Sequence, residues 1–220
     1  MRKLVCIFPE DESTNFLLPI YTQLEKLSGF IGYRFNTLDL QKRNSLYDAL
    51  NQLEEDSFLV FLGHGASNKL YGSINDNGDK QVLFDKDNTK QLRNIDFLCI
   101  ACRSKEFARN HFQNYIGFGD ITSDFSEILA ERDIGDSNYM NWANEDDIIN
   151  FQNVFVEAVT KAILLTSCND LFSIYKMMRL CFNKQIADLL KKKSLTNYRN
   201  IADMLFEVLN DLTYCSTNKL

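Results

Sequence analysis

Short hydrophobic runs alternate with longer amphipathic or polar connections through the first half of the chain. The runs are nearly continuous, which is typical of strands buried on both faces of a parallel sheet. Two connections have helical spacing: residues 15–27, and a stretch that begins after a cap at Asn44 or Ser45 and continues to Leu53. This alternation predicts an α/β fold with a mostly parallel sheet flanked by helices. The expected strands are residues 4–8, 30–35, 58–62, 95–101 and 115–118.

Residues 66–94 interrupt this alternation. They are rich in glycine, asparagine and aspartate, which are typical of turns, so we expect a hairpin or an irregular excursion before the next strand. A long segment of this kind next to a site often acts as a movable lid, and we therefore expect the isolated chain to be weakly active or silent.

The last third of the chain is wholly helical in pattern. Apolar residues recur at helical spacing within residues 151–163, 171–186 and 198–212. We expect these stripes to pack in the core; a groove that binds a partner is the alternative. The chain is therefore predicted to be one domain, residues 1–220, with a helical part at 145–220 packed on it.

Composition restricts the classes of partner. The chain has 220 residues, 45% of them hydrophobic, and 24 Lys and Arg against 30 Asp and Glu give a formal charge of −6. This charge disfavours direct binding to nucleic acid or to an anionic membrane. The dense basic run at residues 191–193 is interpreted as a solvated helix end.

The six cysteines are scattered and lack the paired spacing of a zinc site. We therefore expect no metal and no other cofactor, and unpaired thiols indicate a reducing compartment. The first apolar run is too short for a signal peptide, and no later run approaches the roughly 18 apolar residues of a membrane span. These features predict a cytoplasmic protein.

One histidine and one cysteine follow directly after expected strands. His64 comes just after the strand at 58–62, and Cys102 after the strand at 95–101. Catalytic groups collect beyond the carboxyl ends of parallel strands, and neighbouring strands lie only about 4.8 Å apart. If the two strands are neighbours, His64 can serve as the base for a nucleophilic Cys102 thiol.

The residues around Cys102 support this pairing. Residues 103–108 resemble the first turns of a helix, whose free N–H groups and dipole would lower the pKa of the thiol. Gly65 has no side chain, so its backbone N–H can approach a developing oxyanion closely. Cys99 is expected on the opposite face of its strand, in the core, and His111 lies about 13 Å along a helix from Cys102, too far to be its base.

Together these motifs resemble the signature of the caspase-like cysteine peptidases, and the bacterial CHAT-domain proteases are the nearest match. One apolar strand ends in LGHG, residues 62–65, and another ends in CIAC, residues 99–102. The segments 115–120 and 150–158 fall where CHAT domains place their next strand and helix. The resemblance implies a caspase-like fold and hydrolysis of peptide bonds, with His64 as acid and base, Cys102 as nucleophile, and the N–H groups of Gly65 and Cys102 as oxyanion donors.

The resemblance also implies a biological setting. Bacterial relatives are often switched on by a partner within defence or programmed-death systems, so it suggests a protein substrate and an activating or inhibitory protein partner. The sequence departs from CHAT domains after the cysteine: residues 103–106 read RSKE, where many of them have a small acidic-serine-glycine turn.

Two other hypotheses come from different classes of protein. One is a caspase-like interaction module without useful turnover, which the intact pair of His64 and Cys102 disfavours. The other is a nucleotide-binding domain, which is disfavoured because the first strand leads into the acidic sequence PEDE, residues 9–12, where a phosphate cradle needs glycines and free N–H groups.

Asp120 is the candidate for substrate specificity. It follows the strand at 115–118, where it can line the pocket for the side chain that precedes the scissile bond. Several caspase-like families that cleave after arginine or lysine place a carboxylate there, and a carboxylate pairs well with a guanidinium. Asp120 could instead cap a helix that begins near Ser123, and Asp124, Asp76 or Asp79 could supply the charge.

Overall fold

The computed structural model describes residues 2–36, 40–74, 80–168 and 170–217, and its centre is a six-stranded sheet. The strand order is β2-β1-β3-β7-β8-β9, in which the first five strands are parallel and β9 is antiparallel to β8. The strands are β1 (Leu4–Pro9), β2 (Phe30–Phe35), β3 (Phe58–Leu62), β7 (Asp96–Ile100), β8 (Asn114–Gly117) and β9 (Thr213–Cys215). The mostly parallel α/β sheet predicted from the sequence is confirmed.

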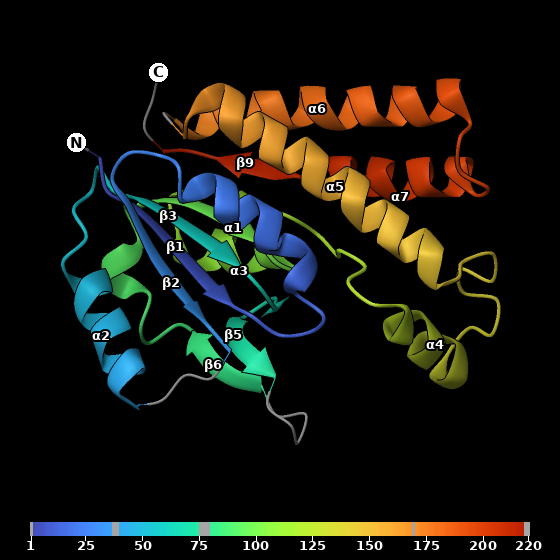
Figure 1. Cartoon of the computed structure of the whole chain (residues 1–220). Helices are drawn as coiled ribbons and strands as arrows, with labels where there is room; N and C mark the ends of the chain where they lie inside the picture. Colours follow the sequence, from blue (N-terminus) through green and yellow to red (C-terminus); the bar gives the residue numbers. More distant parts are fainter. Residues whose placement is uncertain (1, 37–39, 75–79, 169, 218–220) are drawn as a thin grey trace.

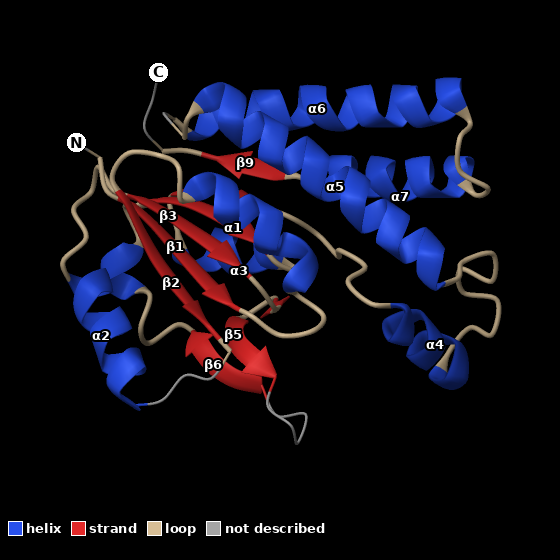
Figure 2. Cartoon of the chain, viewed as in Figure 1, coloured by secondary structure: helices blue, strands red, loops and turns tan. Residues whose placement is uncertain are grey.

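Helices cover both faces of this sheet (Figures 1 and 2). One face packs against α1, α5, α6 and α7, and the other against α2 and α3. Figure 1 shows α5, α6 and α7 side by side, coloured from yellow-orange to red, with α4 at one end of the layer. The helices are α1 (Leu18–Leu24), α2 (Leu40–Asn51), α3 (Ser104–His111), α4 (Phe125–Ile134), α5 (Glu145–Thr166), α6 (Leu171–Lys192) and α7 (Tyr198–Asp211).

Alternation along the strands divides the core in two. In β7, Leu98 and Ile100 belong to the cluster beneath α5, α6 and α7, whereas Phe97 and Cys99 belong to the cluster beneath α2 and α3. Successive side chains of a strand point to opposite faces, so a strand buried on both sides must be apolar throughout. Cys99 is fully buried, as predicted.

The excursion after β3 forms a small antiparallel sheet. It contains β4 (Gly65–Ala66), β5 (Lys69–Ile74) and β6 (Lys80–Phe84), in that order, followed by a 3₁₀ turn at Lys90–Leu92. Leu70, Leu83 and Phe84 are buried in the core cluster beneath α2 and α3. The hairpin predicted in 66–94 is therefore confirmed, and it packs against α3 and against β1 of the main sheet (Figure 2).

Some boundaries differ from the sequence-based prediction. The helix α2 begins at Leu40, ahead of the cap expected at Asn44 or Ser45. The expected helix at 15–27 is a 3₁₀ turn, Asn15–Leu17, followed by α1, which ends at Leu24. The edge strand β9 was not predicted, because its three residues are only half-buried and form no hydrophobic run.

Among the described residues, α5 is the one helix that is long and apolar enough to cross a membrane, with a mean hydropathy of 1.4 over its best window. No such segment was expected from the sequence. Its apolar stripe is in the core, where Phe151, Phe155 and Val159 are at most 1% exposed. This burial is that of a core helix in a folded domain.

Gly117 offers a test of how tightly α3 packs against β8. A Cβ at Gly117 would lie 2.7 Å from Lys105 Cα and 2.8 Å from Lys105 N, both backbone atoms that cannot move aside independently. We expect Gly117→Ala to lower the free energy of unfolding by about 2 kcal/mol or more, because overpacking costs about 1–3 kcal/mol.

Gly72 provides the matched control in β5. A Cβ there would meet its nearest neighbour at 3.5 Å, an ordinary contact, so Gly72→Ala should cost less than about 1 kcal/mol. Urea denaturation of both variants measures the difference. Equal stabilities would contradict the close approach of α3 to β8.

Candidate active site

His64 and Cys102 come together beyond the carboxyl ends of two neighbouring strands. The strands β3 and β7 pair in parallel with Leu62 opposite Ile100, and each functional residue lies two positions beyond its member of that pair. Gly63 N–H continues the pairing by donating to Ile100 O at 3.1 Å. Both residues line one small cavity of about 20 Å³, so the structure places them at the same edge of the sheet, and their action as a catalytic pair stays a prediction.

The imidazole of His64 is held by a carboxylate that sequence reasoning missed. His64 Nε2 lies 2.8 Å from Asp11 Oδ2 and 3.2 Å from Ser13 Oγ. The side chains of His64 and Asp11 are only 11% and 12% exposed, so the interaction is largely shielded from water. An ionised carboxylate is only an acceptor, so Nε2 carries the proton and Nδ1 is left to accept one.

Asp11 is itself fixed by the turn that follows β1. Its Oδ1 accepts hydrogen bonds from Thr14 N–H at 3.1 Å and from Ser13 Oγ at 2.9 Å. Asp11 lies just past the carboxyl end of β1, the strand next to β3. Its position just past the end of a strand was the available signal in the sequence, because catalytic groups collect at such strand ends.

The Cys102 thiol is neutral and hydrogen-bonded. Its Sγ–H donates to Ile121 O at 3.1 Å, and Ile121 N–H approaches Sγ at 3.4 Å. The pKa of the thiol is raised to about 11, chiefly by burial and also by the negative charges of Glu127 and Asp120, although the backbone hydrogen bond with Ile121 lowers it in part. The expectation of a lowered pKa was therefore wrong for this conformation.

The reason lies in the first turn of α3. A helix does begin after Cys102, but its leading N–H groups are already used: Arg103 N donates to Gly119 O at 2.9 Å and Lys105 N to Phe118 O at 2.8 Å. N–H groups that bind backbone carbonyls cannot also stabilise a thiolate. Desolvation then decides the protonation state of Cys102.

The backbone around Cys102 is closely packed against Gly65. A Cβ at Gly65 would lie 2.5 Å from Cys102 O and 3.0 Å from the Ala101 Cβ, so only glycine fits. Tyr71 N–H donates to His64 O, so the next pair along these antiparallel strands, Gly65 and Leu70, is a non-hydrogen-bonded pair. The N–H of Gly65 therefore points away from Leu70. Gly65 and Cys102 thus lie side by side, as the oxyanion prediction requires, and their role as donors stays a prediction.

Asp120 lies in a different cavity from His64 and Cys102. It is exposed, and with Thr122 it lines a cavity of about 250 Å³ bordered by α7, whereas Ile121 lines the cavity of His64 and Cys102. It does not cap a helix: α4 begins at Phe125, and its cap is Asp124, which accepts from Ser126 N at 2.7 Å. The role of Asp120 in specificity stays a prediction, and the alternatives Asp76 and Asp79 lie outside the described residues.

The remaining candidates are not part of this site. His111 is at the end of α3, where its ring lies 4.6 Å from that of Phe107 and its Nδ1 is 3.0 Å from Thr89 Oγ1. Burial lowers its pKa. Within the described ranges, no three His, Cys, Asp or Glu side chains are grouped so that they could hold a metal ion.

The state of the thiol can be tested directly. At pH 8, iodoacetamide should alkylate Cys102 about 100-fold more slowly than a small thiol of ordinary pKa, because a pKa of about 11 leaves correspondingly less thiolate. The rate should continue to rise up to about pH 11. Mass spectrometry of the peptide that contains Cys102 measures it, and the urea-unfolded chain is the control, in which the rate should be normal. Rapid alkylation of the folded chain at pH 7 would show that the thiol is already activated.

Neither a protein-family model nor a curated protein matches this sequence. The functional interpretation therefore depends on the geometry of the site and on the resemblance carried by its two motifs.

Proposed function

We propose that the chain is a cysteine endopeptidase of the caspase-like type that acts through His64 and Cys102. The observation that carries this proposal is that the two residues line one cavity, with a largely shielded carboxylate that binds the histidine. A nucleophile, a base and a group that orients the base are what covalent catalysis by cysteine requires. The parallel sheet and the position of both residues after neighbouring strands support the resemblance to CHAT-domain proteases.

The reaction can be followed from the residues. The Cys102 thiol gives its proton to His64 Nδ1, and the sulfur attacks the peptide carbonyl carbon. The N–H groups of Gly65 and Cys102 stabilise the oxyanion that forms. His64 then protonates the leaving amine, a thioester remains on Cys102, and a water molecule that gives its proton to His64 hydrolyses it to a carboxylic acid and the free thiol.

Asp11 has a positioning role in this scheme. Its carboxylate keeps the proton of the neutral ring on Nε2 and stabilises the imidazolium that forms after proton transfer. A fixed negative charge in a site shielded from water acts strongly because the local dielectric is low.

The described conformation is a resting state in this proposal. The cavity of about 20 Å³ cannot admit a peptide, and the thiol is tied to Ile121 O. Opening must therefore precede binding, which agrees with a cytoplasmic effector that acts on a protein substrate after a protein partner engages it. A setting in bacterial defence is part of the proposal and rests on the resemblance.

A second candidate function is a caspase-like interaction module that binds a protein partner without turnover. The raised pKa of Cys102 and the closed cavity favour it. Trapping distinguishes the two functions, because only an enzyme forms a thioether to Cys102 with an electrophilic peptide at a rate that saturates with peptide concentration.

Substitution of the two central residues tests the proposal. Cys102→Ala and His64→Ala should abolish proteolysis and leave stability nearly unchanged, since both residues lie beyond the strand ends. The readout is the set of new protein N-termini in a cell lysate incubated with each variant.

Cys99→Ala is the control for this experiment. Cys99 is fully buried, so its truncation should lower the free energy of unfolding by about 1–2 kcal/mol while cleavage continues. An inactive Cys99→Ala together with an active Cys102→Ala would overturn the assignment.

Asp11→Asn tests the positioning role. Asparagine retains an acceptor but loses the charge, so we expect kcat to fall at least about 10-fold with KM nearly unchanged, as for other groups that orient a catalytic histidine. The measurement uses a substrate identified in the lysate experiment.

Ser13→Ala is the matched control, because it removes a contact to the same nitrogen at 3.2 Å and a hydrogen bond to Asp11 Oδ1 but leaves the carboxylate of Asp11 in place. It should change kcat by less than about 3-fold, since the charge next to His64 remains and Thr14 N–H still holds Asp11 Oδ1. An Asp11→Asn enzyme with unchanged kcat would remove Asp11 from the mechanism.

A further inference from the structure

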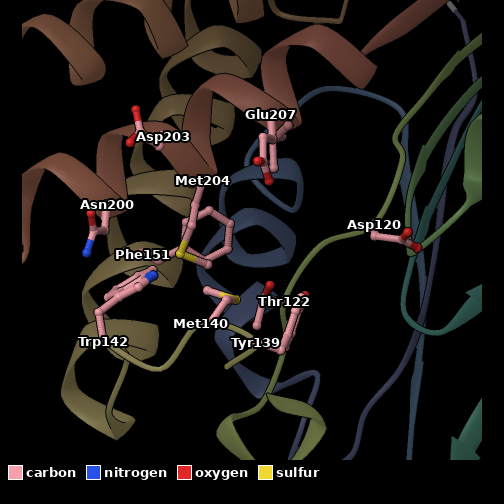
Figure 3. A pocket seen from close by; sticks show the side chains of 11 residues that line it. Asp120, Thr122, Tyr139, Met140, Trp142, Phe151, Asn200, Asp203, Met204 and Glu207 are labelled. Atoms are coloured by element: carbon pink, nitrogen blue, oxygen red, sulfur yellow. The ribbon is translucent and has the colours of Figure 1, made fainter. Parts of the chain in front are cut away.

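A second cavity lies directly behind the wall of the candidate active site. Its volume is about 250 Å³, and it lies between α7 and the loop that connects α4 to α5. In Figure 3, Asp203 and Glu207 lie on α7 on one side of this cavity, Trp142 and Tyr139 lie on the other, and Asp120 stands at its edge. We call it the α7 cavity.

Three carboxylates line the α7 cavity: Asp120, Asp203 and Glu207. Asp203 and Glu207 are exposed and four positions apart on one helix, where like charges repel, and neither they nor Asp120 form an ion pair with another described residue. Two nearby cations are engaged elsewhere. Arg199 bonds the hydroxyl of Tyr198 at 3.1 Å, and Arg132 donates to the carbonyls of Tyr139 and Met140.

The other walls of the α7 cavity are aromatic and partly open. Trp142 is half-buried and Tyr139 is 42% exposed, so their rings are accessible from the cavity. Besides burial, the charges of Glu131, Glu207 and Asp120 raise the pKa of Tyr139, which is consistent with the carboxylates that line the cavity. Aromatic faces beside carboxylates are the environment that binds guanidinium and alkylammonium groups, through cation–π contact and ion pairing.

One short segment forms a wall of both cavities. Asp120 and Thr122 line the α7 cavity, whereas Ile121 and Ser123 line the cavity of His64 and Cys102. This alternation is that of an extended chain, whose successive side chains point to opposite sides. The carbonyl that accepts the Cys102 thiol proton, Ile121 O, belongs to this shared wall.

We propose that the α7 cavity binds a guanidinium or alkylammonium group and that its occupancy controls the reactivity of Cys102 through residues 120–123. The binding of a cation in the α7 cavity does not depend on peptidase activity. Only the effect of this binding on catalysis rests on the proposed function.

The direction of the effect follows from the charges. A bound cation near Asp120 offsets one of the charges that disfavour the thiolate of Cys102. A ligand in the cavity also contacts Asp120 and Thr122, the neighbours of Ile121, whose carbonyl accepts the hydrogen bond of the thiol. The bound state therefore favours a reactive thiol, and a ligand that binds one state better shifts the population toward it.

The only tryptophan of the chain, Trp142, reports on this cavity. Titration with butylguanidinium should change its fluorescence in a saturable way, whereas butylurea, a neutral analogue of the same shape, should bind at least 10-fold more weakly. N-acetyl-arginine amide, titrated in parallel, shows whether the site prefers an arginine side chain carried on a peptide to a free cation.

Two paired variants localise the binding. The double variant Asp203→Asn, Glu207→Gln should lose at least 10-fold in affinity for butylguanidinium. The control Asp87→Asn, Glu157→Gln removes the same charges from exposed positions outside the cavity and should bind as the wild type does. Equal responses to butylguanidinium and butylurea, or unchanged affinity in the first variant, would overturn the site.

The coupling has its own readout. Saturating butylguanidinium should accelerate alkylation of Cys102 by iodoacetamide at least 3-fold in the wild type and not in the Asp203→Asn, Glu207→Gln variant. Saturable binding without any change in alkylation would overturn the control of Cys102. Because neither measurement involves proteolysis, a failure of the peptidase proposal leaves both results interpretable.

Discussion

Parallel pairing of β3 with β7 is the constraint on which the candidate site depends. It sets Leu62 against Ile100, so that residues at equal distances beyond this pair must meet at the same edge of the sheet. A shift of one residue in either strand would move every side chain of that strand to the other face, and the buried apolar residues on both faces prevent such a shift. The core thus fixes the distance between His64 and Cys102 without any direct bond between them.

The chain just after β8 fixes the position of residues 120–123, which form the wall next to the Cys102 thiol. Ser104 is buried, and its hydroxyl donates to Cys99 O at 2.9 Å and accepts from Phe118 N–H at 2.8 Å. It therefore joins the carboxyl ends of β7 and β8, just before the chain reaches Gly119 and the wall residues. A further bond, from Gln152 Nε2 to Ser123 O at 2.6 Å, holds the far end of the wall to α5. The wall is anchored at both ends, and its middle residue, Ile121, meets Cys102.

The sequence predicted the parts of this arrangement that depend on hydrophobic periodicity. The main parallel strands are found where the apolar runs lie, and so are the helices of the last third. Periodicity could not find β9, which is short and half-buried, nor Asp11, whose role depends on a turn that folds back onto His64. It placed a helix correctly after Cys102, but it could not show that backbone carbonyls already occupy the N–H groups of that helix. The prediction of a lowered pKa for Cys102 was wrong for this reason. The local sequence indicates which N–H donors exist, whereas the tertiary fold decides what they bind.

The neutral thiol and the closed wall stabilise each other. Cys102 Sγ–H can donate to Ile121 O only while it is protonated. A thiolate would lose this donor and would face the negative end of the carbonyl dipole at about the same distance, although Ile121 N–H at 3.4 Å offsets part of the repulsion. Deprotonation therefore weakens the closed state, and opening exposes the sulfur to water, which removes the desolvation that raises the pKa of the thiol. Movement of the wall and deprotonation of the Cys102 thiol are thus one linked equilibrium, and any ligand or partner that binds the open wall more tightly lowers the pKa of Cys102 without touching it.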